Sequence, residues 1–114
     1  MKTFALSFLS IVFTFASLDV SATNVWTGYK TLTEVQVVED GGFLLYFSTP
    51  IGSPCSPAGA NALYIYIGGN FVTADGAKGM LAASLSALAT GMKVSVLYDD
   101  STSFCYGRYL RVTP

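Results

Sequence analysis

One segment in the second half of the chain limits the available folds most, because it is the one convincing helix of the expected domain. Its apolar residues follow an i, i+4, i+7 pattern and are Leu81, Leu85 and Leu88. Thr73 and Asp75 are both suited to cap the start of a helix, and Gly91 is placed to end it. The pattern predicts a helix between these signals, in a domain whose other segments have the pattern of strands.

Five strands are expected around this helix. They cover Val25–Glu39, Phe43–Ser48, Leu63–Ile67, Met92–Tyr98 and Phe104–Val112. The first strand alternates with one slip, which a bulge near Thr33 and Glu34 would absorb. The sequence Asp40-Gly41-Gly42 suits a hairpin turn after it. The second strand is a continuous apolar run, which predicts that both of its faces are covered.

The order of these elements, β-β-β-α-β-β, is that of an OB-fold, a small Greek-key barrel. A ferredoxin-like arrangement needs two helices, and a sandwich does not need this one. The expected fold class is therefore all-β with one helix, in the form of a five-stranded OB-fold-like barrel.

The chain holds two cysteines, Cys55 and Cys105, and no histidine. In an oxidising compartment the two thiols are expected to form a disulfide. Closing a loop of about 50 residues stabilises a fold by roughly 4 kcal/mol in the chain-entropy model. A reactive or metal-binding thiol is the alternative, but zinc ligation is disfavoured without a histidine or a second pair of cysteines. No metal and no other cofactor is expected.

The N-terminus has the pattern of a secretory signal peptide, with Lys2 before an apolar run over residues 4–15 and small residues before Ala22. We expect residues 1–22 to be removed, which leaves 23–114 as a single secreted or periplasmic domain. An uncleaved membrane anchor is the alternative, but the apolar run is shorter than the roughly 20 residues that span a bilayer. No later segment is apolar enough to span a membrane.

The chain lacks the residues that most catalytic mechanisms require. Without histidine, Ser-His-Asp and Cys-His arrangements are excluded. The carboxylates beyond the signal peptide are Glu34, Glu39, Asp40, Asp75, Asp99 and Asp100. A glycosidase pair among them would need a deep cleft, for which a barrel this small has little room. A formal net charge of −1 without a basic stripe also disfavours nucleic-acid binding. The chain is not expected to be an enzyme.

The expected helix carries no charge between Gly79 and Gly91. Its leucine face is expected to cap the barrel, while the opposite face has small residues that permit close approach of another backbone. These candidate interface residues are Ala82, Ala83, Ser86 and Ala87. We expect this face to pack against further copies of the chain in a ring. The alternative is that a lightly charged secreted protein tolerates an exposed face of alanine and serine.

Aromatic side chains exceed what a barrel of this size must bury. They are Trp26, Tyr29, Tyr64, Tyr66, Tyr98, Tyr106 and Tyr109. Tyrosine and tryptophan suit a site where a ring stacks on a ligand while its polar tip forms a hydrogen bond, and sugars are such ligands. More than half of these rings are expected only to pack between strands and helix.

Several short patterns carry a resemblance to a known family. The domain starts with Trp26-Thr27-Gly28, continues with LTEVQV at residues 32–37, similar to SELHV, and ends its helix in Ala-x-Gly before KVSVLY at residues 93–98. With the expected disulfide and barrel, the chain resembles the B subunits of bacterial AB5 toxins, in particular the subtilase-cytotoxin and pertussis-like group. The resemblance implies a homopentamer whose helices line a central pore, whose outer faces bind host-cell glycans, and whose partner is an A subunit.

By position, this resemblance leaves three groups of candidate ligand-binding residues. The serine with which some members of the family bind sialic acid would fall near Gly28. The resemblance therefore does not imply that this chain binds sialic acid. The candidates are Tyr29, Lys30 and Thr31 on the first strand, Asp99, Asp100 and Ser101 in the last turn, and Arg108 and Tyr109 beside them. The expected function is a secreted, non-catalytic, ring-forming module that binds carbohydrate. The alternative is a monomeric periplasmic protein-interaction or inhibitor domain.

Overall fold

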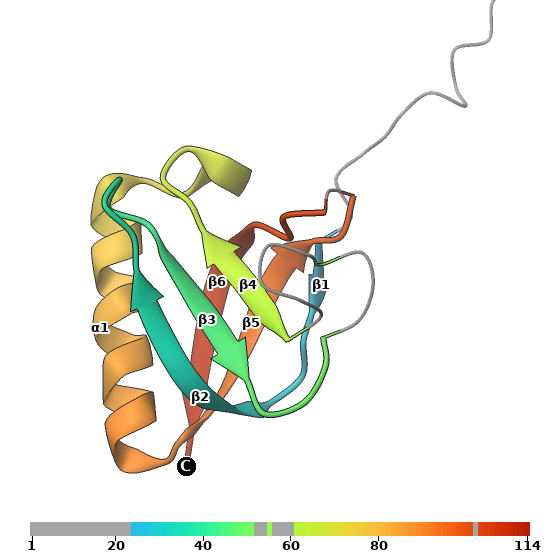
Figure 1. Cartoon of the computed structure of the whole chain (residues 1–114), viewed down its shortest axis with the longest axis vertical. Coiled ribbons are helices and arrows are strands. Elements are labelled where there is room, and N and C mark those ends of the chain that lie inside the picture. The colour runs from blue at the N-terminus through green and yellow to red at the C-terminus, as the bar shows by residue number, and fades with distance from the viewer. Residues whose placement is uncertain (1–23, 52–54, 56–60, 102) are drawn as a thin grey trace, which may run out of the picture.

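A curled antiparallel sheet with one α-helix against it makes up the fold (Figure 1). The computed structural model describes residues 24–51, Cys55, 61–101 and 103–114. The strands are β1 (Asn24–Trp26), β2 (Lys30–Val37), β3 (Phe43–Phe47), β4 (Ala62–Ile65), β5 (Lys93–Asp99) and β6 (Gly107–Thr113). The chain passes from β4 to β5 through a short 3-10 helix, η2 (Gly69–Phe71), and the helix α1 (Ala74–Thr90). The expected signal peptide and its cleavage site lie outside the described residues.

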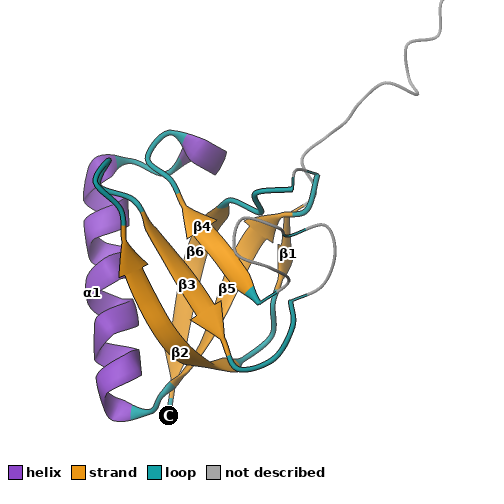
Figure 2. Ribbon diagram, viewed as in Figure 1, coloured by secondary structure: helices purple, strands orange, loops and turns teal. Residues whose placement is uncertain are grey.

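Two groups of strands meet in the sheet. The strands β2, β3 and β4 pair antiparallel in that order. β5 pairs antiparallel with β6 on one edge and with both β1 and the start of β2 on the other. A parallel bridge joins Tyr64 of β4 to Tyr106, just before β6. Figure 2 shows the resulting half-barrel. The expected combination of a barrel-like sheet and one α-helix is therefore confirmed.

The first expected strand, Val25–Glu39, is in fact two strands joined by a bend. At this bend the Thr27 N–H donates to the Val96 carbonyl at 2.9 Å, and the Val96 N–H donates to Thr27 Oγ1 at 3.0 Å. The threonine hydroxyl thus stands in for a backbone acceptor. Gly28 follows with a φ of +76°, which glycine adopts without strain. The bend lets one continuous segment pair first with β5 and then with β3.

The bulge expected in this segment is confirmed, because the register of β2 against β3 shifts between Leu32 and Glu34. The hairpin turn after it is confirmed as well. Asp40 Oδ1 accepts a hydrogen bond from the Gly42 N–H at 2.8 Å, and Gly41 has a φ of +92°. These two features set β3 between β2 and β4.

The core lies inside the curl of the sheet. Its largest fully buried apolar side chains come from β3, β4 and β5 and include Phe43, Phe47, Leu45, Leu63, Ile65, Val94 and Val96. Leu44 is buried on the other face of β3, so both faces of this strand are covered, as its continuous apolar run predicts. Each such large side chain stabilises the fold by roughly 1.5–3 kcal/mol through burial.

The ends of α1 agree with the sequence signals. Thr73 Oγ1 accepts a hydrogen bond from the Gly76 N–H at 3.0 Å, which caps the N-terminus. Gly91 ends the helix with a φ of +72°. Within the described ranges, no helix combines the length and the apolar character that crossing a bilayer requires.

The face that α1 buries coincides with the expected leucine face only at Leu81, which is half-buried and packs against the core. The residues that α1 buries fully are Ala77, Ser84 and Ala87. Leu85 and Leu88 are instead 46% and 37% exposed. Small side chains let the helix lie close to a sheet whose own large side chains already fill the interior. Ser84 is accommodated there because its hydroxyl donates to the Met80 carbonyl at 2.7 Å.

This packing also redistributes the candidate interface residues of the helix. Ala87 is fully buried against the sheet and is therefore not available to a partner chain. Ala82 and Ser86 are exposed, and Ala83 is half-buried. The outer face of α1 thus combines small residues with the two exposed leucines.

Cys55 and Cys105 form the expected disulfide, with a Cα–Cα distance of 5.2 Å. Both residues are buried, at 3% and 0% exposure. The bond ties the loop after β3 to the segment before β6, close to the Tyr64–Tyr106 bridge. It therefore holds the segment just before β6 against β4.

Candidate ligand-binding surface

The strands β1, β5 and β6 turn one face toward the core and the other toward solvent. Val94 and Val96 are fully buried on the inner face. On the outer face, Trp26, Leu97 and Tyr109 lie directly opposite one another across the three strands. Trp26 is 37% exposed and Tyr109 is 53% exposed. We call these three residues the outer row.

Arg111 adds a positive charge beside the outer row. Its cross-strand partner is Ser95, and its guanidinium carbon lies 3.9 Å from the centre of the Trp26 ring. A cation over an exposed aromatic ring stabilises by about 0.5–1 kcal/mol. No carboxylate in the described part of the chain forms an ion pair with Arg111. No described carboxylate thus competes with a ligand for its N–H groups.

A second bulge shapes the start of β6. The register against β5 slips by one residue between Tyr109 and Gly107, so Arg108 has no partner on β5. A bulge re-aims the side chain of its extra residue. Here the Arg108 guanidinium carbon lies 5.1 Å from the ring centre of Tyr109 and 5.1 Å from that of Phe71. Two rings thus flank this cation.

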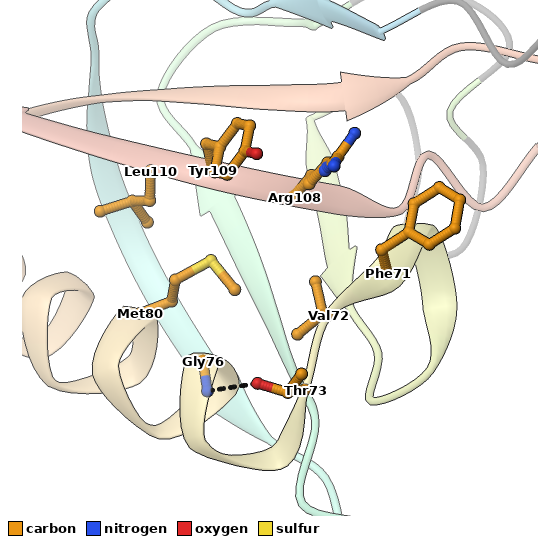
Figure 3. Close-up of a pocket in the computed structure, with 8 residues that line it drawn as sticks. All are labelled: Phe71, Val72, Thr73, Gly76, Met80, Arg108, Tyr109 and Leu110. Carbon is orange, nitrogen blue, oxygen red and sulfur yellow. Dashed lines mark hydrogen bonds between the residues drawn. The ribbon is translucent and has the colours of Figure 1, made fainter.

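The same rings border a pocket of about 410 Å³ between β6 and the start of α1 (Figure 3). Its lining residues are Phe71, Val72, Thr73, Gly76, Met80, Arg108, Tyr109 and Leu110. The Thr73 hydroxyl is already used to cap α1, and Arg108 is the one charged residue in this lining. The volume falls within the range of roughly 300–1,000 Å³ that small-ligand sites occupy.

Phe71 is a feature of the pocket that the sequence does not predict. Its side chain is 80% exposed, and both Asn70 and Phe71 have a positive φ, at 50° and 68°. The Asn70 amide holds this turn by donating to Asn24 Oδ1 at 2.8 Å and to the Tyr106 carbonyl at 3.0 Å. A left-handed conformation costs a residue such as phenylalanine roughly 1–2 kcal/mol. An exposed ring held by strained backbone points to a ligand contact.

The candidate residues of the first strand lie near one end of β5. Thr31 pairs with Lys93 and is exposed, and Tyr29 is 50% exposed. The Lys30 ammonium donates to Thr49 Oγ1 at 2.8 Å. These residues are accessible, but none of them lines the pocket.

The acidic candidates lie at the other end of β5. Asp99 is buried, and its Oδ1 accepts hydrogen bonds from the Ser101 N–H at 2.8 Å and the Ser101 hydroxyl at 2.6 Å, which closes the turn. Asp100 is half-buried. At about 3.4 Å per residue, Asp99 is about 20 Å along β5 from Lys93. The structure therefore separates two of the three candidate groups and brings Arg108 and Tyr109 together.

A separate aromatic cluster surrounds the bridge between β4 and β6. Tyr106 stacks on Tyr66 and Phe104, with ring centres 5.6 and 5.7 Å apart. Tyr64 meets the rings of Tyr66 and Tyr106 edge-on, and its hydroxyl donates to Asp40 Oδ2 at 2.9 Å. Burial raises the pKa of Tyr64 to about 12, and the Asp40 carboxylate adds to this effect. These rings pack on one another and explain much of the aromatic content.

Among the described residues, no three histidine, cysteine or acidic side chains gather closely enough to hold a metal ion. Comparisons with protein-family models, curated proteins and solved structures find no match. The outer row and the pocket therefore provide the basis for inferring function.

Proposed function

We propose that the protein is a secreted, non-catalytic binding module that holds a carbohydrate on the outer row. The observation that carries the proposal is the row on one sheet face in which the exposed Trp26 and Tyr109 flank the half-buried Leu97. Aromatic rings stack on the apolar face of a sugar ring, while the indole N–H and the phenol form hydrogen bonds. Arginines lie over one face of each ring, Arg111 at Trp26 and Arg108 at Tyr109, so the row offers the remaining exposed surface of two rings to one extended ligand.

The groups around the outer row suit the same ligand. Arg111 supplies N–H donors for sugar hydroxyl oxygens, and Thr31 supplies a hydroxyl further along the same face. A flat surface holds a sugar chain without the deep cleft and paired carboxylates that hydrolysis needs. This geometry favours binding over catalysis.

The strand pairings support an OB-type barrel as the scaffold. The segments β1 and β2 act as one bent first strand, which pairs with β3 and with β5. β4 approaches β6 in parallel at the Tyr64–Tyr106 bridge, and β6 pairs with β5. A partly open, five-stranded Greek-key barrel has this arrangement.

We expect copies of the chain to contact one another in a ring through the outer face of α1. Leu85 and Leu88 are exposed there beside Ala82 and Ser86. Contiguous exposed apolar side chains mark interaction surfaces. A ring with these helices toward its axis, and an A subunit as partner, is what the resemblance to toxin B subunits implies.

The test is a glycan array probed with the mature protein and with Trp26→Ala and Arg111→Gln. Loss of the Trp26 ring is expected to weaken glycan binding about tenfold, because both the stacking surface and the indole donor are removed. Phe104→Ala is the matched control, since it removes a ring that is 49% exposed but lies outside the outer row. Absence of any glycan binding, or equal binding by Trp26→Ala, would refute the proposal.

A further inference from the structure

The strand β6 has one edge that is not paired along most of its length. Its pairing with β5 uses the other edge, and in the described structure β4 forms a backbone bridge only to Tyr106, just before β6. An unpaired edge exposes backbone N–H and C=O groups that can pair with another strand. The pocket described above lies along this edge (Figure 3).

The direction of the backbone groups of Leu110 follows from the bonds of its partner. Leu110 lies opposite Val96, and both the N–H and the C=O of Val96 are bonded to Thr27 on the far side of β5. The Val96–Leu110 pair is therefore the non-hydrogen-bonded kind, in which backbone groups point away from the partner strand. The N–H and C=O of Leu110 thus point out of the sheet edge, where no described residue bonds them.

The pocket places a cation beside these backbone groups. Arg108 is two residues before Leu110 on β6, and its guanidinium is held between the rings of Phe71 and Tyr109. No described residue forms a hydrogen bond or an ion pair with this guanidinium.

We infer that this pocket receives a short extended segment of another protein, which adds to the edge of β6 and places a carboxylate on Arg108. The segment would exchange backbone hydrogen bonds with Leu110, the mode called β-strand addition. Guanidinium and carboxylate form paired, charge-assisted hydrogen bonds. The exposed Phe71 ring and Met80 offer apolar contact to its other side chains. This peptide binding goes beyond the proposed sugar binding, and the two sites share only Tyr109.

A phage-displayed library of random short peptides, selected on the immobilised mature protein, tests the inference. The enriched peptides are expected to share an acidic residue within a β-forming pattern. Arg108→Gln is expected to weaken their affinity by about tenfold or more, the effect of losing a charged hydrogen bond. Lys93→Gln is the matched control, because it removes an exposed positive charge outside the pocket and is expected to leave the affinity unchanged.

A change made in the peptide keeps the test independent of protein folding. Methylating the peptide amide that pairs with the edge removes its donor, and it is expected to abolish binding, whereas methylation at a neighbouring amide is not. The Leu110 amide is expected to become protected from hydrogen exchange when the peptide binds.

Three outcomes would overturn the inference. The first is no enrichment over phage without an insert, and the second is peptides that bind Arg108→Gln as tightly as the natural protein. The third is a dimer formed through this edge, seen as protection of the Leu110 amide that rises with protein concentration in the absence of peptide. Each outcome is distinguishable from failure of the glycan proposal, which depends on Trp26.

Discussion

Gly107 is the residue at which the closing strand passes the core. A Cβ at this position would lie 2.4 Å from Ile65 Cδ1 and 3.0 Å from Val96 Cγ1. Gly107→Ala is therefore expected to lower the free energy of unfolding by about 1–3 kcal/mol, the usual range for overpacking a core. Urea denaturation measures the change.

The matched control for this substitution is Gly79→Ala. Gly79 lies within α1, and a Cβ there meets nothing within 4 Å. This variant is expected to raise the free energy of unfolding by about 0.5–1 kcal/mol through helix propensity. If both variants changed stability equally, close approach at Gly107 would not explain its glycine.

Tyr64 makes stability depend on alkaline pH. Burial first, and then the hydrogen bond to Asp40, raise its pKa from 10.0 to about 12. The folded state therefore favours the neutral phenol, so this stabilisation is complete below pH 10 and is lost as the pH rises from 10 to about 12. Tyr64→Phe is expected to flatten the loss of stability over that range, measured by urea denaturation at a series of pH values.

A second variant separates the contribution of the carboxylate from that of burial. Asp40→Asn removes the negative charge and keeps an oxygen that can accept a hydrogen bond. The ultraviolet titration of Tyr64 is expected to shift to lower pH in this variant. An unchanged titration would mean that burial alone raises the pKa.

At the site, the sequence indicates some residue types but not their arrangement. Arg108 and Tyr109 are predictable as polar and aromatic residues of the last strand. The contact of the Arg108 guanidinium with the Tyr109 ring depends on a one-residue bulge. The alternation of polar and apolar residues in so short a strand does not reveal that bulge. Phe71 depends on two successive left-handed residues, and the preceding Gly68-Gly69 indicates only a turn.

Among the secondary-structure elements, α1 offers a direct test of a sequence signal. Thr73→Ala removes the hydroxyl that accepts from the Gly76 N–H, and it is expected to lower the free energy of unfolding by about 1 kcal/mol. Thr90→Ala is the control, because that hydroxyl bonds only the Ser86 carbonyl within the helix. Thermal unfolding compares the two. An equal loss in both would show that the cap does not anchor α1.

Elements that depend on residues close together in the sequence are predicted well, whereas the buried face of α1 is not. The bulge near Thr33 and the turn at Gly41 follow from alternation and from glycine conformation. The choice of the face that α1 buries does not follow from such local patterns, because a leucine face and an alanine face can both pack on a sheet. The space left inside the curl decides between them, and it depends on side chains far apart in sequence. Ala87 therefore lies inside while Leu85 lies outside.

For the whole molecule, the outer face of α1 predicts the state of assembly. Leu85→Glu places a charge on this apolar face and is expected to convert a ring into monomers, because an unpaired charge is costly to bury. Lys78→Glu is the control, since it changes an exposed residue near the start of the same helix. Light scattering on a sizing column gives the native mass. A monomeric natural protein would contradict ring formation.

The disulfide has a mechanical consequence. The residues from Cys55 to Cys105 form a covalently closed loop that contains β4, α1 and β5. When the two ends are pulled apart, only the segments outside the loop lengthen, by about 140 Å instead of the roughly 300 Å available to the uncrosslinked domain. Single-molecule pulling with and without a reducing agent is expected to show this difference. A module joined to a partner at one end and to a cell surface at the other would thus remain a short tether under load.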